Sequence, residues 1–174
     1  MNVMTIRPAL ELETKSGFHF TVRPADESDD PALTAFFEEH VTKDDLRFRF
    51  LSPAQHVNQK QIEAMTHIDH RQTEDFLAFA PDNEEIIASA VLAADKAMQT
   101  AEVAFTVHAD YKGKGIESRL LEYVTTQARA RGLKKLIAIE SRENHCTITL
   151  EREMGFKTKA IDGEPMLVML ETTL

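Results

Sequence analysis

The chain has 174 residues, of which 43% are hydrophobic, and this length and composition favour one soluble globular domain with a substantial core. Its formal net charge of −9 at pH 7 argues against binding to nucleic acid or to an anionic membrane, because phosphate binding requires a basic surface. No stretch approaches the roughly 20 apolar residues of a membrane span, and a single cysteine, Cys146, excludes an internal disulfide and a cysteine-rich metal site.

The amino-terminal end, MNVMTIRPAL, lacks the basic segment, apolar run and small-residue cleavage site of a secretory signal, so we expect a cytoplasmic protein. We expect residues 1–174 to form one domain, with residues 1–9 as a flexible or edge segment. Residues 10–13 and 18–22 alternate in polarity on either side of Lys15-Ser16-Gly17. This pattern predicts a β-hairpin.

Two helices are expected next. Apolar residues recur at helical spacing over residues 31–40, with Pro31 in the first turn, and a second helix is expected from about Pro53 to Met65. Between these helices, residues 46–51 alternate in polarity, which places both arginines of this segment on one side. We interpret these arginines, Arg47 and Arg49, as structural.

The second half of the chain reads as strands and helices in alternation. We expect strands over residues 76–80, 86–94 and 102–107, a helix from 116 to 128, a strand over 136–139, a helix over 145–154, and a closing hairpin of 156–161 and 166–170. The late helix would bury Cys146 as a small apolar side chain. The fold class is therefore α/β (α+β), with a mixed, mostly antiparallel central sheet and helices on both faces.

A glycine-rich turn connects the third of these strands to the helix that follows it. Gly113 and Gly115 allow a sharp turn with bare N–H groups, and the start of the helix near Ile116 adds its positive dipole end. Lys112, Lys114 and Arg119 add positive charge to the same region. The turn is thus suited to a phosphate-bearing cofactor.

Two other phosphate-binding motifs fit this turn less well. A P-loop is excluded because its glycine spacing and its Gly-Lys-Ser/Thr sequence are missing. A dinucleotide fingerprint requires a third glycine where Ser118 stands, although Glu140 does end the next strand. NAD binding therefore stays open as a minor alternative.

The turn resembles the signature of the GNAT-superfamily N-acetyltransferases, Gln/Arg-x-x-Gly-x-Gly/Ala around the pyrophosphate of coenzyme A. The segments Glu143-Asn144 and Met154-Gly155-Phe156 are similar to the second landmark of that superfamily. Four further segments resemble the acetyltransferase domain of Pat-type protein lysine acetyltransferases: Val22-Arg23-Pro24, Leu46-Arg47-Phe48-Arg49-Phe50, Ile68-Asp69-His70 and Ala101-Glu102-Val103-Ala104. The resemblance covers about residues 10–170.

The resemblance implies a binding site for acetyl-CoA as cosubstrate, with the pyrophosphate on the turn and the pantetheine arm on the preceding strand. The cofactor-binding residues that it implies are Phe105, Thr106, Val107, Lys112, Gly113, Lys114, Gly115, Ile116, Glu117, Ser118 and Asn144. Glu117 departs from the pattern because a small residue is usual there, and its carboxylate would compete for the helix terminus. The alternative role of Glu117 is that of an acid which stabilises the first helical turn.

The transfer of an acetyl group to an amine requires a base, since a lysine with a pKa of about 10.4 is protonated at neutral pH. By the resemblance, Glu102 is the general base. The position of the tyrosine that serves as general acid in many family members is Glu151 here, so no general acid is assigned. His67 and His70 lack a third metal ligand, and no metal is expected.

These observations predict an acetyl-CoA-dependent N-acetyltransferase that acts on a primary amine. The resemblance favours a protein lysine as acceptor, and small amines such as polyamines stay open. The alternative is a noncatalytic module that keeps the fold as an acyl-CoA sensor or a protein-interaction surface. We expect a monomer or homodimer that binds neither nucleic acid nor membrane.

Overall fold

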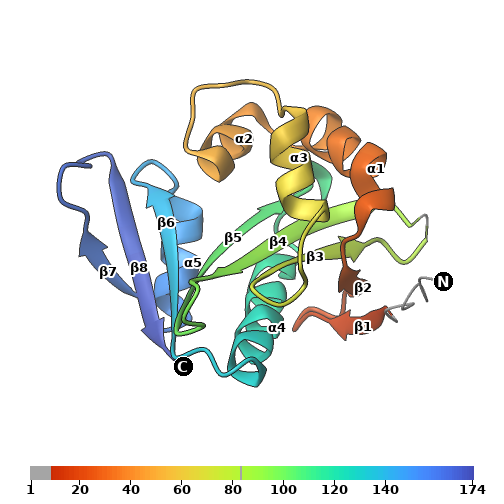
Figure 1. Cartoon of the computed structure of the whole chain (residues 1–174). Coiled ribbons are helices and arrows are strands. Elements are labelled where there is room, and N and C mark those ends of the chain that lie inside the picture. The colour runs from red at the N-terminus through yellow and green to blue at the C-terminus, as the bar shows by residue number, and fades with distance from the viewer. Residues whose placement is uncertain (1–8, 83) are drawn as a thin grey trace.

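The structure is a computed structural model that describes residues 9–82 and 84–174, so residues 1–8 of the expected edge segment lie outside it. Its sheet has the strand order β1-β2-β3-β4-β5-β6-β8-β7 (Figure 1). The strands are β1 (Leu10–Glu13), β2 (His19–Pro24), β3 (Thr73–Phe79), β4 (Ile86–Ala94), β5 (Thr100–Val107), β6 (Lys135–Ser141), β7 (Lys157–Ala160) and β8 (Leu167–Thr173). Within the described residues every pairing is antiparallel except that of β5 with β6, which confirms the predicted mixed sheet.

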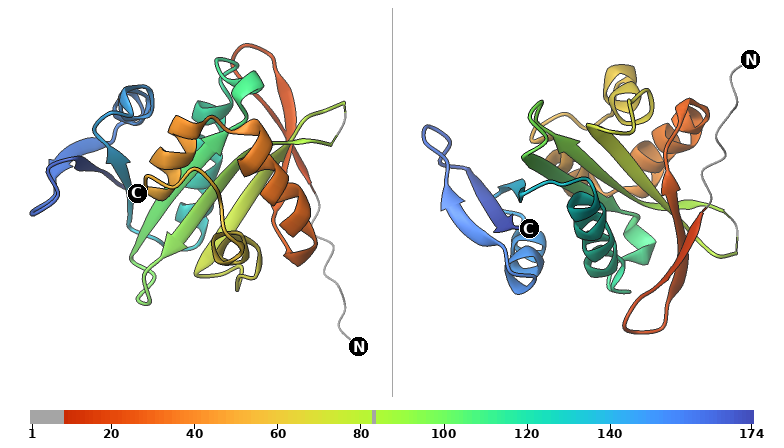
Figure 2. Two further views of the ribbon diagram at one scale, coloured as in Figure 1. Left: turned by 90° about the horizontal axis from the view of Figure 1, so that it is seen from above. Right: turned by 60° about the horizontal axis from the view of Figure 1, so that its bottom comes forward.

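Helices cover both faces of the sheet (Figures 1 and 2). The α-helices are α1 (Asp30–Ala35), α2 (Lys43–Phe50), α3 (Gln59–Thr66), α4 (Ile116–Ala130) and α5 (His145–Glu153), and shorter helical segments are η1 (Glu27–Asp29), η2 (Phe36–His40) and η3 (Ala109–Tyr111). None of the helices in the described part of the chain is long and apolar enough to cross a membrane.

Two apolar clusters hold these layers together, and the alternation of the strands assigns side chains to each. Phe76 of β3 packs in one cluster with Leu120 of α4. The next residue, Leu77, packs in the other cluster with Phe37 of η2 and Leu46 of α2. Successive residues of a strand point to opposite faces, so one strand supplies both cores.

The prediction that residues 46–51 alternate as an extended segment is wrong. These residues form most of α2, which Thr42 caps by accepting a hydrogen bond from the Asp45 N–H at 3.1 Å. Residues two positions apart in a helix, such as Arg47 and Arg49, point about 200° apart around its axis. Arg47 and Arg49 therefore point in different directions instead of sharing a side.

Two further predictions need correction. The second expected helix begins at Gln59 and not near Pro53, because Asn58 caps it. The Asn58 side chain accepts from the Gln61 N–H, and the Gln61 side chain accepts from the Asn58 N–H, both at 2.9 Å. Cys146 is exposed and not buried. The residue that α5 buries completely is Glu151. The spacing of apolar residues in this helix therefore predicted the wrong face as the buried one.

The sheet opens between β5 and β6. β5 and β6 pair over three residues only: Thr100 with Lys135, Ala101 with Leu136, and Glu102 with Ile137. Beyond Glu102, β5 continues along β4 and β6 continues along β8. At the far end of the sheet, β7 is the edge strand and all four of its residues are exposed. The divergence of β5 from β6 determines where the candidate site lies.

Candidate active site

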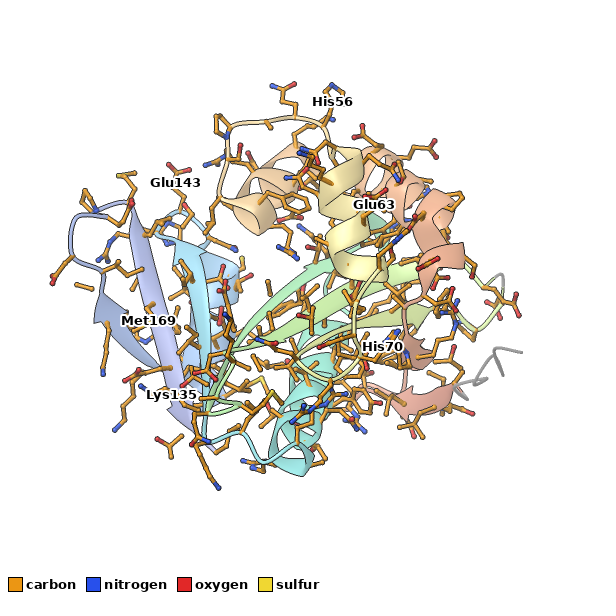
Figure 3. The ribbon with its side chains drawn as sticks, in the orientation of Figure 1. His56, Glu63, His70, Lys135, Glu143 and Met169 are labelled. Atoms are coloured by element: carbon orange, nitrogen blue, oxygen red, sulfur yellow. The ribbon has the colours of Figure 1, made fainter. Side chains whose placement is uncertain are left out.

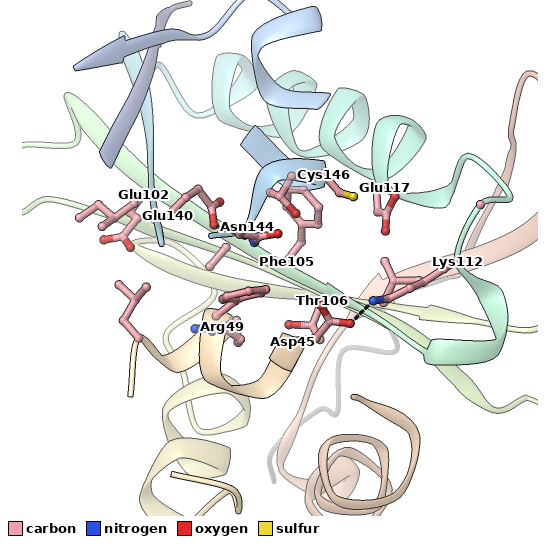
Figure 4. Close-up of a pocket in the computed structure, with 17 residues that line it drawn as sticks. Asp45, Arg49, Glu102, Phe105, Thr106, Lys112, Glu117, Glu140, Asn144 and Cys146 are labelled. Carbon is pink, nitrogen blue, oxygen red and sulfur yellow. Dashed lines mark hydrogen bonds and ion pairs between the residues drawn. The ribbon is translucent and has the colours of Figure 1, made fainter. Parts of the chain in front are cut away.

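A cleft of about 340 Å³ lies where β5 and β6 part (Figure 4). It is walled by α2, by the glycine turn and first residues of α4, and by the start of α5. Its lining residues are Asp45, Phe48, Arg49, Leu51, Glu102, Ala104, Phe105, Thr106, Val107, Lys112, Gly113, Glu117, Ile139, Glu140, Asn144, Cys146 and Thr147. The divergence of two neighbouring strands thus creates a concave site without breaking the sheet.

The glycine turn lies at one end of this cleft. Gly113 and Gly115 have φ angles of 78° and 84°, which favour glycine over residues with a side chain. A Cβ atom on Gly115 would lie 3.4 Å from the Cβ of Thr14 in the β1–β2 hairpin. The hairpin also holds the turn from outside, where the Ser16 hydroxyl donates to the main-chain oxygen of Lys114 at 3.1 Å.

The electrostatics of the turn differ from the expected basic cluster. Lys112 forms an ion pair with Asp45 of α2, which reaches across the cleft (Figure 4). Lys114 lies 5.5 Å from the ring centre of Phe18, and Arg119 lies 3.7 Å from Glu122. Only one of the three cations of this region therefore lines the cleft.

Glu117 brings a second acid to the same end of the cleft. Burial raises the pKa of its carboxyl, Lys112 lowers this pKa and Asp45 raises it. The carboxyl is therefore partly desolvated and lies within range of both charges. Both of the roles considered for Glu117 are compatible with this position, since it begins α4 and also lines the cleft.

The edge of β5 forms the floor of the cleft. Its residues Phe105, Thr106 and Val107 line the cleft and follow the last pair that β5 makes with β6. The Oγ1 atom of Thr106 is buried and has no hydrogen-bond partner in the described part of the chain. Main-chain and side-chain groups on this strand are thus free to bind a ligand that fills the cleft.

Charged groups gather at the other end, where β5 and β6 meet. Glu102 is half-buried there, and Arg49 reaches toward it from α2 (Figure 4). Burial lowers the pKa of Arg49, while the charges of Asp75, Glu102 and Glu140 raise it. Its guanidinium donates a hydrogen bond to the sulfur of Met65 at 3.7 Å.

Glu140 and Glu151 form a buried acidic pair behind this end. Glu140 lines the cleft from β6 with 8% of its surface exposed, and Glu151 on α5 is fully buried. Burial and the neighbouring Glu140 raise the pKa of Glu151 to about 10, and burial raises the pKa of Glu140. Asn144 donates to Glu140 at 3.4 Å and makes no side-chain cap on α5.

The outer rim of the cleft is also acidic. Glu143, labelled in Figure 3, lies between the end of β6 and α2 and accepts a hydrogen bond from Arg47 at 3.0 Å. Arg47 also lies 3.5 Å from Asp44. Arg47 therefore has ion-pair partners, as expected for a structural residue, whereas Arg49 lines the cleft.

The structure brings most of the predicted site residues together. Glu102, Phe105, Thr106, Val107, Lys112, Gly113, Glu117 and Asn144 line the cleft, whereas Lys114, Gly115, Ile116 and Ser118 do not. Sequence reasoning missed Asp45 and the cleft position of Arg49, and it considered Glu140 only as the acidic residue of a dinucleotide fingerprint. The sequence offered a signal for Arg49 alone, since its segment was among those that carried the resemblance.

Histidines lie outside this cleft. His67 hydrogen-bonds Asp30 at 2.8 Å and His70 hydrogen-bonds Glu74 at 2.6 Å, which fits the expected structural roles. His40, Glu85 and His108 also come together, with both Nε2 atoms within 3.3 Å of one Glu85 oxygen. Because the Asp110 N–H donates to Nδ1 of His108, Nε2 of His108 carries the proton, which opposes metal binding there.

Comparisons with known proteins agree with this geometry. A model of the acetyltransferase (GNAT) family matches residues 35–156. The GNAT domain of S. lividans PAT is 27% identical, with a TM-score of 0.86 over 95% of this chain and 97% of that chain. An acetyltransferase of Pseudomonas aeruginosa is 25% identical over 142 residues, which are 80% of this chain and 76% of that protein.

A more distant structure shows the same fold. Spermidine N-acetyltransferase from Vibrio cholerae, solved with CoA and spermine, has a TM-score of 0.70 at 17% identity over 88% of this chain and 95% of that chain. The glycine turn, the parted strands and the family match over residues 35–156 together lead to one conclusion. The chain belongs to the acetyltransferase (GNAT) family.

Proposed function

We propose that the protein is an acetyl-CoA-dependent N-acetyltransferase that acts on a primary amine. The observation that carries this proposal is the cleft between β5 and β6, which has the glycine turn at one end and Glu102 at the other. A long, narrow donor with phosphates at one end and a thioester at the other suits such a cleft. The family supports acetyl transfer to amines.

The chain's own residues suit this donor in two places. The unpaired edge of β5 and the free hydroxyl of Thr106 offer hydrogen bonds to the amides of the pantetheine arm. The N–H groups of the turn and the start of α4 offer a site for the pyrophosphate. Asp45 and Glu117 oppose this second interaction through their charge.

Glu102 supplies the base in this proposal. The ammonium form of an amine has no free electron pair, so one proton must leave before nitrogen can attack the thioester carbon. Glu102 lines the cleft beside the last β5–β6 pair and takes that proton. The nitrogen–carbon bond then forms, the carbon–sulfur bond breaks, and the thiol and the acetylated amine leave.

A protein lysine is the acceptor that we propose. The similarity to the GNAT domain of S. lividans PAT over nearly its whole length supports it. The acidic rim at Asp44 and Glu143 suits a cationic substrate. Acetylation of a lysine-containing peptide in preference to spermidine would support this choice, and the reverse preference would assign the acceptor to the polyamines. We place the enzyme in the cytoplasm as a monomer or homodimer.

Calorimetry with acetyl-CoA and with CoA, followed by acetyl transfer in Glu102→Gln, tests the proposal. We expect nearly unchanged affinity for acetyl-CoA and a turnover that falls most near neutral pH, where the proton of the acceptor must be removed. Equal turnover in both proteins across pH would remove Glu102 from the mechanism.

The position of Glu117 and Asp45 in the cleft favours a second candidate, a noncatalytic acyl-CoA sensor or protein-interaction module. Binding of acetyl-CoA without transfer to any amine would identify the sensor. If neither acetyl-CoA nor CoA binds, the protein-interaction module is the candidate that stays. An increase of NADH fluorescence on addition of the protein would in that case support dinucleotide binding instead.

A further inference from the structure

The buried acidic pair of Glu140 and Glu151 has no function in the reaction as described so far. Glu151 is fully buried and no cation pairs with it in the described part of the chain; its carboxyl faces that of Glu140. A buried carboxylate without a partner costs several kcal/mol. A carboxyl group in this position is therefore expected to hold a proton.

The position of the pair connects it to the cleft. β6 alternates, so Leu136, Ala138 and Glu140 face the core beneath α5. Glu140 is three residues beyond Ile137, the last β6 residue that pairs with β5, and it lines the cleft there. Glu151 lies behind it, so Glu140 is the member of the pair that a ligand in the cleft can touch.

The polar and charged groups that face the pair come from α5, α2 and β5. Asn144 at the start of α5 donates to Glu140. The cation of Arg49 from α2 favours the ionised form of Glu140, while the charge of Glu102 from β5 disfavours it. For Glu151 the neighbouring charge is Glu140 itself, which raises the pKa. The pair as a whole therefore retains one proton at neutral pH.

We propose that Glu140, which shares a proton with Glu151, donates it to the thiolate that leaves during acyl transfer. This inference rests on the proposed function. At the end of the cleft where β5 and β6 meet, Glu102 then acts as the general base and Glu140 as the general acid. Their different environments, half-buried and nearly fully buried, allow two carboxyls to act as base and acid at one pH.

The proton balance of the transfer is complete with these groups. As the carbon–sulfur bond breaks, sulfur takes the bonding electron pair and the proton of Glu140, which leaves the pair with one more negative charge. The nitrogen gives up its second proton to solvent when the adduct collapses, and Glu102 holds the first. Release of that proton to solvent and uptake of another by the pair restore both groups. A thiolate formed beside an already ionised Glu140 would instead meet like-charge repulsion in a desolvated site.

The kinetic test compares wild type, Glu140→Gln and Glu151→Gln, with Glu153→Gln on the exposed side of α5 as the matched control. In Glu140→Gln we expect kcat to fall about tenfold or more, with KM for acetyl-CoA changed less than about twofold. We also expect the profile of kcat against pH to lose its alkaline limb, the decrease of kcat at high pH that deprotonation of the acid causes. In Glu151→Gln the alkaline limb moves to lower pH, because the pair loses the carboxyl that holds the shared proton most tightly.

A purely structural role of Glu151 would lower kcat without moving that limb. Infrared absorption gives a second readout that needs no turnover. The protonated carboxyl absorption at neutral pH should be stronger in wild type and in Glu153→Gln than in the Glu140→Gln/Glu151→Gln double variant, since buried Asp75, with its pKa raised to about 7, contributes equally in all three.

The results separate this inference from the proposed function. Wild type that transfers no acyl group to any amine overturns the proposed function and this role with it. Normal transfer by wild type, together with an unchanged pH profile in Glu151→Gln or full kcat in Glu140→Gln at every pH, overturns only the role of the pair. Equal protonated carboxyl absorption in wild type and in the double variant overturns the inference too.

Discussion

Glu117 is the residue at which local electrostatics and family pattern oppose each other. If a pyrophosphate binds the turn at the start of α4, the carboxylate repels it, so Glu117→Gly should tighten CoA binding by an amount on the order of 1 kcal/mol, with a smaller effect at high salt. The same change puts glycine into a helix and removes a favourable charge–dipole interaction, so it should lower the melting temperature of the unliganded protein.

Glu117→Gln separates the two effects, since it removes the charge but keeps a side chain of similar size. It should match Glu117→Gly in the calorimetric gain of CoA affinity and lose less stability. Unchanged or weaker CoA binding in both variants would show that the carboxylate does not face the pyrophosphate.

Glu151 makes folding stability depend on pH. Its pKa is raised in the folded protein, so the folded state keeps a proton that the unfolded chain releases above its ordinary range. Stability due to this group is complete at acidic pH and falls as pH rises, by at most about 1.4 kcal/mol per pH unit. The melting temperature of Glu151→Gln should therefore exceed that of wild type increasingly between about pH 5 and about pH 9.

Thermal melts of the exposed variant Glu153→Gln, run at the same pH values, provide the control and should follow wild type. A constant difference between Glu151→Gln and wild type across this range would mean that Glu151 does not hold a proton in the folded state.

At the residue scale, the sequence predicted best those site residues that lie close together along the chain. Phe105, Thr106 and Val107 belong to one strand, and Lys112 and Gly113 follow directly. Asp45 and Glu140 reach the cleft only because α2 and β6 pack beside β5. That proximity depends on tertiary packing, which no local pattern contains.

At the scale of elements, the turns before and after α4 offer a matched pair of glycines. Gly113 and Gly132 have φ angles of 78° and 80°, and a Cβ atom on either would meet no atom within 4 Å. Alanine at each position should thus lower the free energy of unfolding by about 1 kcal/mol for the same backbone reason. Only Gly113 lines the cleft, so only Gly113→Ala should also weaken CoA binding.

Urea unfolding and calorimetry with CoA check the two parts of this prediction separately. Equal loss of CoA affinity in Gly113→Ala and Gly132→Ala would attribute the effect to lowered stability and not to the turn.

Secondary structure was predictable wherever burial follows the period of the element. β6 and α4 bury residues on a single regular face, and their predicted ranges lie within the observed ones. In α2 the residues Arg47 to Phe50 alternate in polarity, yet Thr42 caps a helix there. The capping residue and packing onto the sheet outweigh the alternation, since short segments have weak intrinsic preferences.

At the scale of the whole molecule, β5 and β6 are joined by three residue pairs, and a bound ligand would contact elements on both sides of this connection. CoA at about 100 times its Kd should stabilise the fold by about 2.7 kcal/mol, which corresponds to a rise in melting temperature of about 5 to 10 °C for a chain of this size.

Differential scanning calorimetry with CoA measures this rise, and NADH at the same concentration serves as the control. A shift with NADH and none with CoA would contradict the proposed cofactor, whereas shifts with both would indicate that the cleft recognises only phosphates.

The exposed edge strand β7 has a consequence for association between copies of the chain. An open edge is a template for strand addition, which leads to aggregation. Lys157 and Lys159 are both exposed on this short strand, and Lys159 pairs with Glu171 of the neighbouring β8. A second copy aligned along β7 would bring further lysines next to these two. Charge repulsion thus protects this end of the sheet from strand addition.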